Sequence, residues 1–185
     1  NTLLKTRAPQ SALEPWTEQL IKFGAELSAE RVKLVDDLNP YVGEHYRNLN
    51  EVKPASISYK SSTEGLTADI SENVRILQER AVEVARQEID RGASLIGPHR
   101  DDLHLQLGDF PAKGYASHGE SWSMAIALRI GSYTLLKSEG ADPVLILDDI
   151  FAELDNQRRQ QLTAVTQMAE QTIITTDRKS TRLNS

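Results

Sequence analysis

The feature that most constrains the fold is an apolar run, from Pro143 to Leu147, that ends in two adjacent carboxylates, Asp148 and Asp149. The run is too short for a buried helix and too rich in branched residues for a loop. It therefore predicts a strand buried on both faces, as in a parallel sheet. In open α/β sheets, ligands bind beyond the carboxyl ends of the strands. Acids delivered to that edge match the Walker B arrangement, in which an aspartate holds Mg²⁺ at a nucleotide phosphate. An acidic helix cap after a core strand is the alternative.

A second stretch, from Ala116 to Ser123, favours the nucleotide site. Ser117 and Gly119 stand in a loop before an apolar helix, where free N–H groups and a hydroxyl can face an anion. Together the two stretches resemble the composite site of ABC/SMC-type ATPases. In those proteins a Ser-x-Gly signature loop contacts the γ-phosphate that the opposite protomer holds.

Three motifs occur in one order along the chain: Gly-Pro-His-Arg-Asp-Asp-Leu at 97–103, Ala-Ser-His-Gly-Glu at 116–120, and Leu-Asp-Asp-Ile-Phe-Ala-Glu-Leu-Asp at 147–155. Their order and spacing resemble the RecF family of bacterial recombination mediators, over nearly all of the chain to about Thr176. The resemblance implies an α/β fold, the C-terminal lobe of an ABC/SMC-type P-loop ATPase head with a helical lid or arm subdomain.

The expected domain organisation has three parts. Residues 1–92 form a mainly helical lid or arm subdomain with a short strand, and residues 93–176 form the C-terminal lobe of the ATPase head. Residues 177–185 lack apolar periodicity and resemble the translation of a sequencing-adapter oligonucleotide, so we interpret them as a non-native tail. A native basic tail is the alternative.

Apolar residues spaced by three and four predict an amphipathic helix from Ser11 that ends at Asn39-Pro40. It is either a helical arm of the kind that SMC-like ATPases insert into the head, or an ordinary helix of a helical subdomain. Its apolar positions are Leu13, Trp16, Leu20, Phe23, Leu27 and Leu34.

Further elements follow from local patterns. Ile57 and Tyr59 alternate with polar residues and predict a half-exposed strand. A helix is expected from Ser71, with Gly92 just beyond its C-terminus. Thr172 to Thr175 predicts a second core strand, which would form a parallel βαβ unit with the apolar run.

The resemblance assigns a role to each candidate site residue. Asp148 ligates Mg²⁺. Asp149 stands where many ABC-type enzymes carry the catalytic glutamate that orients the attacking water, and its shorter side chain implies slow hydrolysis. Ser117 and Gly119 bind the γ-phosphate of a nucleotide held by the other subunit.

The remaining assignments also come from the resemblance. Thr175 or Thr176 falls where a residue senses the γ-phosphate, and Arg100 is a candidate contact to nucleotide or partner. Glu120 stands where relatives often carry glutamine, and we expect its charge to point away from the phosphate. A D-loop that crosses the dimer interface is expected at Ala152, Glu153, Leu154 and Asp155.

The resemblance implies ATP and Mg²⁺ as cofactors and a role in DNA repair, DNA replication and the SOS response. The implied partners are gapped DNA or single-strand/double-strand DNA junctions, the RecR and RecO proteins, and a second copy in an ATP-dependent homodimer. The net charge of −6 argues weakly against this part alone being a strong nucleic-acid binder. The absence of cysteine and of any long apolar run fits a cytoplasmic location with no membrane partner.

One expected part is missing, because no Gly-x-x-x-x-Gly-Lys-[Ser/Thr] occurs in the sequence. Without that loop nothing here cradles the β- and γ-phosphates. We therefore expect a C-terminal fragment of a weak ATPase that does not hydrolyse ATP by itself. Three alternatives stay open: the head of another SMC-like chromosome protein, a non-catalytic interaction module, and, least favoured, a metal-dependent nuclease using Asp101, Asp102, Asp148 and Asp149.

Overall fold

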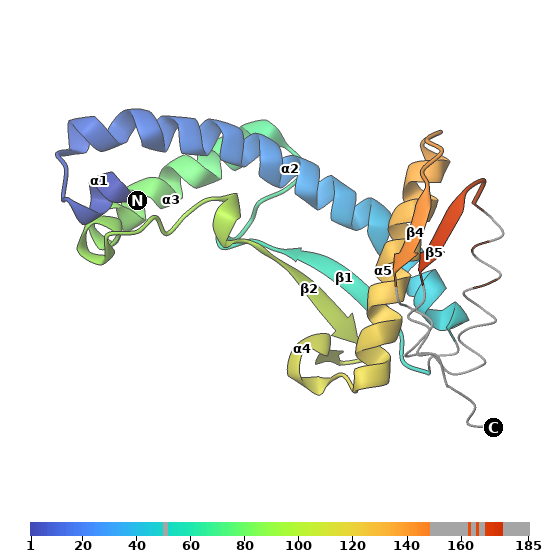
Figure 1. The fold of residues 1–185 in the computed structure, drawn as a ribbon. Coiled ribbons are helices and arrows are strands. Elements are labelled where there is room, and N and C mark those ends of the chain that lie inside the picture. Colours follow the sequence, from blue (N-terminus) through green and yellow to red (C-terminus); the bar gives the residue numbers. More distant parts are fainter. Residues whose placement is uncertain (50–51, 149–162, 164–165, 167–168, 176–185) are drawn as a thin grey trace, which may run out of the picture. The chain divides into compact units, whose positions relative to one another are not determined.

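The computed structural model describes residues 1–49, 52–148, 163, 166 and 169–175 of the chain. The elements follow one another (Figure 1) as α1 (Thr2–Lys5), α2 (Gln10–Asn48), β1 (Ala55–Lys60), α3 (Ile70–Arg91), the 3₁₀ turn η1 (Pro98–Arg100), β2 (Asp102–Leu107), β3 (Phe110–Pro111), α4 (Ala112–Tyr115), α5 (His118–Ser138), β4 (Leu145–Asp148) and β5 (Thr172–Thr175). None of the helices in this part of the chain combines the length and the apolar character needed to cross a lipid bilayer.

The chain divides into two compact units, and each contains two separate segments of the sequence. The first unit comprises residues 1–37 and 57–105, and the second comprises residues 38–56 and 106–185. Both division points near the N-terminal half fall inside regular elements, the first in α2 and the second in β1. The expected boundary at residue 92 is not one of these division points, and the functional subdomains remain a prediction.

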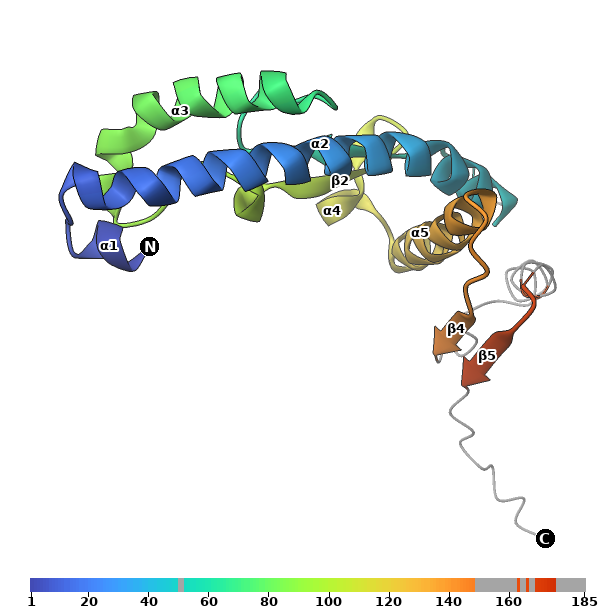
Figure 2. The ribbon, with the colours of Figure 1, turned by 90° about the horizontal axis from the view of Figure 1, so that it is seen from above.

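In the first unit, α3 packs along the N-terminal part of α2 (Figures 1 and 2). Ile21 and Ala25 of α2 form a buried cluster with Leu77 of α3. The Asp69 side chain caps α3 by accepting a hydrogen bond from the N–H of Glu72. The helix ends at Gly92, whose φ of 62° is left-handed, as expected for a glycine beyond a helix C-terminus.

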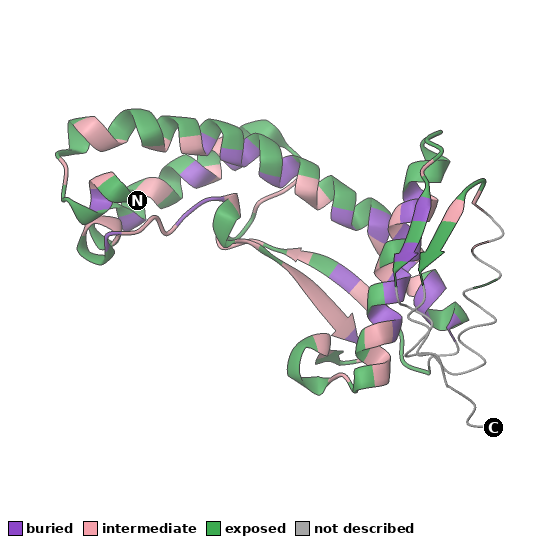
Figure 3. Ribbon diagram, in the orientation of Figure 1, coloured by how far each residue is buried: buried purple, intermediate pink, exposed green. Residues whose placement is uncertain are grey.

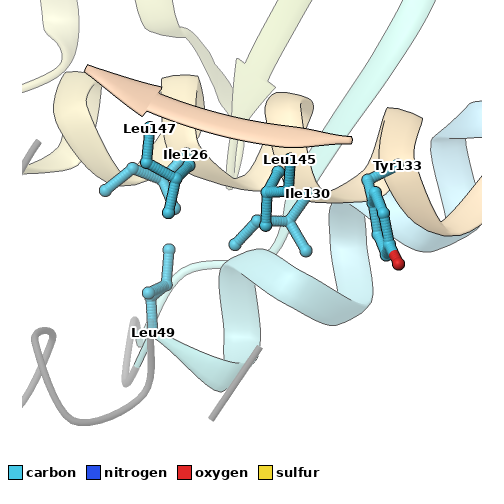
Figure 4. Close-up of a cluster of buried hydrophobic side chains, with 6 residues drawn as sticks. All are labelled: Leu49, Ile126, Ile130, Tyr133, Leu145 and Leu147. Atoms are coloured by element: carbon cyan, nitrogen blue, oxygen red, sulfur yellow. The ribbon is translucent and has the colours of Figure 1, made fainter. Parts of the chain in front are cut away.

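In the second unit, α5 supports the parallel pair of β4 and β5 (Figure 2). The pairing register runs from Leu145 opposite Thr172 to Asp148 opposite Thr175, which confirms the predicted second strand and its parallel pairing. Figure 4 shows the core beneath β4. Burying each aliphatic side chain of this core stabilises the fold by about 1.5–3 kcal/mol. The cluster comprises Leu49, Ile126, Ile130, Tyr133, Leu145 and Leu147.

The prediction that the apolar strand is buried on both faces is wrong for the residues described. Leu145 and Leu147 lie beneath the sheet with 2% and 0% of their surface exposed, whereas Ile146 on the opposite face is 57% exposed. Figure 3 shows this contrast along β4. β5 has no buried residue, and its Ile173 and Ile174 are exposed. A pair of strands supported by one helix buries only the side chains that point toward that helix.

The prediction that α2 ends at Asn39-Pro40 is also wrong, because the helix runs through Pro40 to Asn48. An interior proline removes one backbone hydrogen bond and costs about 3 kcal/mol. Pro40 and Asp36, whose carbonyl loses its partner, both lie on the exposed side. Burial of Val42 and Tyr46, each 0% exposed, keeps the helix intact beyond the proline.

The face of α2 that is buried is not the face that the leucine and aromatic spacing predicted. Trp16, Phe23, Leu27 and Leu34 from the predicted seam are all exposed large hydrophobic residues. The buried positions lie outside that seam, and several of them are small or polar. They include Ile21, Ala25, Ser28, Ala29, Val35, Leu38, Val42, His45 and Tyr46. Small side chains allow close helix packing, but a prediction based on the spacing of large hydrophobic residues does not detect them.

The strand predicted around Ile57 and Tyr59 is confirmed as β1. Ala55 and Ile57 are buried, while Ser58 and Lys60 are exposed. β1 is the outer neighbour of β2 in a three-stranded sheet of order β1–β2–β3, and β2 pairs with β3 in antiparallel orientation.

Gly131 sets the close approach between α5 and the C-terminal part of α2. A Cβ atom at this position would lie 3.3 Å from both Cγ2 and the backbone nitrogen of Val42. We expect Gly131→Val to lower the free energy of unfolding by about 1–3 kcal/mol through overpacking. The matched control is Ala125→Val, at an exposed position of the same helix, which should cost under about 1 kcal/mol. Equal losses in urea unfolding would contradict the assignment of Gly131 to this contact.

His45 links the same two helices in the second unit. Its Nε2 lies 2.9 Å from Oγ1 of Thr134, and that hydroxyl donates to the carbonyl of Ile130 at 3.0 Å. The single hydroxyl proton is thereby used, so Nε2 of His45 is the donor. Burial lowers the pKa of His45, and the carboxylate of Glu44 only partly opposes this effect.

The lowered pKa of His45 predicts a pH dependence of stability. The folded chain binds this proton less readily than the unfolded chain, so stability should fall as the pH drops below about 6.5, the ordinary histidine pKa. We expect His45→Gln, which retains a donor, to flatten the profile of unfolding free energy between pH 7.5 and pH 5. A control variant, His104→Gln in β2, should leave the slope in place. An unchanged slope in His45→Gln would refute the assignment.

Candidate functional site

The start of α5 is closed by a reciprocal capping box. The hydroxyl of Ser117 accepts a hydrogen bond from the N–H of Glu120 at 3.2 Å, and Oε2 of Glu120 accepts one from the N–H of Ser117 at 2.8 Å. This arrangement fixes the loop that contains the predicted Ser-x-Gly motif. The predicted signature residues therefore lie at the N-terminus of a long helix, whose dipole favours a negative ligand.

The second carboxylate oxygen of Glu120 is also used. Oε1 accepts a hydrogen bond from Nζ of Lys53 at 2.7 Å, and only 18% of the Glu120 side chain is exposed. The Lys53 ammonium, together with the N–H and hydroxyl of Ser117, holds the pKa of Glu120 well below its usual range, at about 2. Glu120 therefore stays beside the loop, paired with a cation, and the expectation that its charge points away from a bound phosphate stays a prediction.

The groups left over at this helix start are hydrogen-bond donors. Ser117 uses an acceptor lone pair of its hydroxyl for the cap, and within the described residues its O–H proton is used in no hydrogen bond. The N–H of Gly119, in the first turn of α5, likewise makes none there. Ser117 and Gly119 are both accessible at the surface. An O–H and an N–H that face solvent at a helix N-terminus suit the oxygen of a phosphate.

The predicted metal ligand and the predicted phosphate sensor lie together at the carboxyl end of the parallel pair. Asp148 is the last residue of β4 and stands opposite Thr175, the last residue of β5. The Thr175 hydroxyl donates a hydrogen bond to Oδ1 of Asp148. An exposed carboxylate beside a hydroxyl offers the oxygen ligands that Mg²⁺ prefers, so these residues fit the ion.

Several predicted site residues lie outside the described residues. They are Asp149, predicted to orient the attacking water, Thr176, and the D-loop residues Ala152, Glu153, Leu154 and Asp155. Their roles stay predictions.

Arg100 belongs to the first unit, where its neighbours form a structural network. Its Nη1 donates to the carbonyl of Ser94 at 3.0 Å, and the residue is otherwise exposed. The neighbouring Asp101 accepts hydrogen bonds from the Tyr59 hydroxyl, from Oγ of Ser61 at 3.2 Å and from the N–H of Ser62 at 2.7 Å. Asp101 thus anchors the loop after β1, and burial followed by the Asp101 bond raises the pKa of Tyr59.

The described residues contain no group of three or more histidine and carboxylate side chains close enough to hold a metal ion. Asp102 uses its carboxylate on the N–H of Leu103, at 2.9 Å. Within this part of the chain, the loop acids therefore serve local hydrogen bonds.

The sequence analysis did not predict the Lys53–Glu120 ion pair. Of the two residues, only Glu120 lies in a recognisable sequence pattern. A serine followed three residues later by glutamate at the start of an apolar run marks a capping box, so the position of Glu120 could have been found. Lys53 is 67 residues away in sequence and precedes β1. Nothing in the local sequence connects it to the loop.

The fold has close structural neighbours. The solved structure of the recombination mediator protein RecF-ATPrS in RecFOR pathway superposes with a TM-score of 0.78 at 21% identity, over 92% of this chain and 46% of that one. The corresponding RecF-ATP structure also gives 0.78, at 22% identity, over 97% of this chain and 50% of that one. The chain therefore shares its fold with about half of each of these solved RecF chains.

Sequence relatives give the family. The chain is 50% identical over 179 residues to the DNA replication and repair protein RecF of Rhodococcus erythropolis, a match that covers 89% of this chain and 44% of the relative. It is 45% identical over 186 residues to the protein of the same name from Streptomyces avermitilis, covering 95% of this chain and 50% of the relative. No protein-family model matches. The chain belongs to the RecF family, and it spans about half the length of the curated relatives it matches.

The depressed pKa of Glu120 predicts a stability component that is lost in acid. A carboxylate whose folded pKa is about 2 instead of 4.5 stabilises the fold fully above pH 4.5 and loses this effect as the pH falls toward 2. Glu120→Ala removes the cap and the ion pair and should cost about 1 kcal/mol at pH 7, with a smaller difference from wild type at pH 3. Urea unfolding at both pH values measures this.

The control for Glu120 is Glu79→Ala, which breaks an exposed ion pair with Arg75 on α3. That variant should lose at most about 0.5 kcal/mol. If both variants lost the same amount at pH 7, the capping box would have no special role in stability.

Proposed function

We propose that this chain is the C-terminal portion of a RecF-type ATPase and supplies two elements of a composite ATP site. One is the signature loop, with Ser117 and Gly119 as donors to the γ-phosphate of a nucleotide held by another subunit. The other is the strand end at which Asp148 ligates Mg²⁺. The observation that carries the proposal is the pair of donors, the Ser117 O–H and the Gly119 N–H, at the capped and accessible start of α5, together with membership in the RecF family.

The roles at the strand end follow from the same arrangement. Asp148 offers an oxygen ligand, and the hydrogen bond from Thr175 holds that carboxylate in place. A change in the bound phosphate would therefore affect both β4 and β5. Bound Mg²⁺ would neutralise phosphate charge, which is the chemistry that this cofactor supplies. Asp149 would orient the attacking water, and its short side chain would make hydrolysis slow. Thr175 would also sense the γ-phosphate.

Subunit contacts would complete the site. Ala152 to Asp155 would cross the interface between two subunits as the D-loop, and Arg100 would contact nucleotide or a partner protein. In the whole protein, ATP would close a homodimer on DNA and slow hydrolysis would reopen it. Residues 1–92 would act as the lid or arm and residues 93–176 as the lobe of the head.

The biological role would be DNA replication and repair, which the curated relatives carry in their names. The proposed substrates are gapped DNA or single-strand/double-strand DNA junctions, and the proposed protein partners are RecR and RecO. A cytoplasmic location and a part in the SOS response complete the proposal. Because the sequence contains no Gly-x-x-x-x-Gly-Lys-[Ser/Thr], this chain alone should show no ATP turnover, and turnover by the purified chain would contradict that.

The signature loop can be tested in trans, because it acts on a nucleotide held by another subunit. We expect this chain to associate with the full-length Rhodococcus erythropolis relative when ATP and Mg²⁺ are present and to dissociate when ATP is omitted. Sedimentation measures the association. Ser117→Ala removes the O–H donor and should weaken association by about tenfold or more, in the range for a hydrogen bond to a charged group.

Two variants of Ser117 separate helix capping from phosphate binding. Ser117→Asp keeps a good N-cap acceptor but removes the O–H donor and adds a negative charge, so the helix should stay stable while association is lost. Ser117→Thr keeps both functions and should associate. ATP-independent association of every variant would refute the proposed role of the loop.

A further inference from the structure

The carboxylate of Glu120 poses an electrostatic problem for a loop that faces phosphate. Its Oε2 lies 2.8 Å from the N–H of Ser117, so a negative charge sits within the loop itself. A phosphate at Ser117 and Gly119 would be repelled by an uncompensated carboxylate at this distance. Lys53 compensates that charge, with its Nζ 2.7 Å from Oε1 of Glu120.

The backbone next to Lys53 is hydrogen-bonded to the turn between β2 and β3. The carbonyl of Pro54, the next residue, accepts a hydrogen bond from the N–H of Gly108 at 2.8 Å. Gly108 lies in the turn between β2 and β3 and has a φ of 57°, which favours glycine. The lysine therefore extends from a fixed point toward the start of α5 within the second unit.

The pair also lies beside apolar side chains. Lys53 and Glu120 line a cavity of about 90 Å³ together with Leu107, Phe110 and Tyr115. The rings of Phe110 and Tyr115 stack at 5.3 Å between centroids. The Lys53 side chain is still 56% exposed, so water screens the pair and its main effect is to place the Glu120 carboxylate and offset its charge.

We propose that Lys53 is a positioning residue of the signature loop. It holds the Glu120 carboxylate in the capping box and cancels its charge, so that the Ser117 O–H and the Gly119 N–H can face a nucleotide phosphate. This inference rests on the proposed function of the loop. It assigns Lys53 no contact with the nucleotide, because its ammonium is committed to Glu120.

A double-mutant cycle tests the proposal with the ATP-dependent association in trans. Lys53→Met leaves the Glu120 charge uncompensated and should weaken association by about tenfold or more. Glu120→Gln keeps an N3 side chain that can cap the helix but removes the charge. The double variant Lys53→Met/Glu120→Gln should therefore regain association close to wild type. Lys53→Arg, which keeps the cation, should associate as wild type does.

The outcomes separate the two proposals. If wild type shows ATP-dependent association and the double variant stays as weak as Lys53→Met, Lys53 acts directly on the phosphate and the inference is overturned. If Lys53→Met lowers thermal stability but not association, Lys53 is only structural and the inference is overturned as well. If wild type does not associate at all, the proposed function fails and the inference with it.

The matched control is Lys113→Met, which removes an exposed lysine from α4 in the same unit. It changes the net charge by the same amount as Lys53→Met. Its association should equal that of wild type, and a loss as large as that of Lys53→Met would overturn the specific role of the Lys53–Glu120 pair.

Discussion

The carboxylate of Glu120 is the group on which the start of α5 depends. One oxygen accepts a hydrogen bond from the N–H of Ser117 and the other binds Lys53. A single side chain therefore caps the N-terminus of α5 and connects it to the segment before β1. The cap fixes the position at which α5 begins. The helix then presents its buried side chains to β4, and the strand end that bears Asp148 follows from that packing.

The second unit thus builds both candidate groups on one scaffold. α5 begins at the Ser117 loop, and its Ile126 and Ile130 pack beneath Leu145 and Leu147 of β4. The donors at the helix start and the carboxylate at the strand end are therefore carried by elements that share a core. This is the kind of rigid support that a phosphate site requires.

Local sequence patterns predict several elements of this arrangement, but not the contacts between residues that are distant in the sequence. The strands at Leu145–Asp148 and Thr172–Thr175 and the helix cap at Gly92 follow from local patterns, and the structure contains them. The continuous helix through Pro40 was not predictable from propensity, because burial of residues beyond the proline offsets its cost. The partner of Glu120 was not predictable either, because a contact across 67 residues leaves no local pattern.

The exposed face of the β4–β5 pair has a consequence for how such a chain behaves in solution. Ile146 and its register partner Ile173 are uncharged, branched side chains on this face, and they lie open to water in the described structure. Uncharged strands of this composition are the usual nuclei of intermolecular β-pairing. Polar replacements at Ile146 or Ile173 are therefore expected to weaken association of the isolated chain through these strands without touching the core beneath.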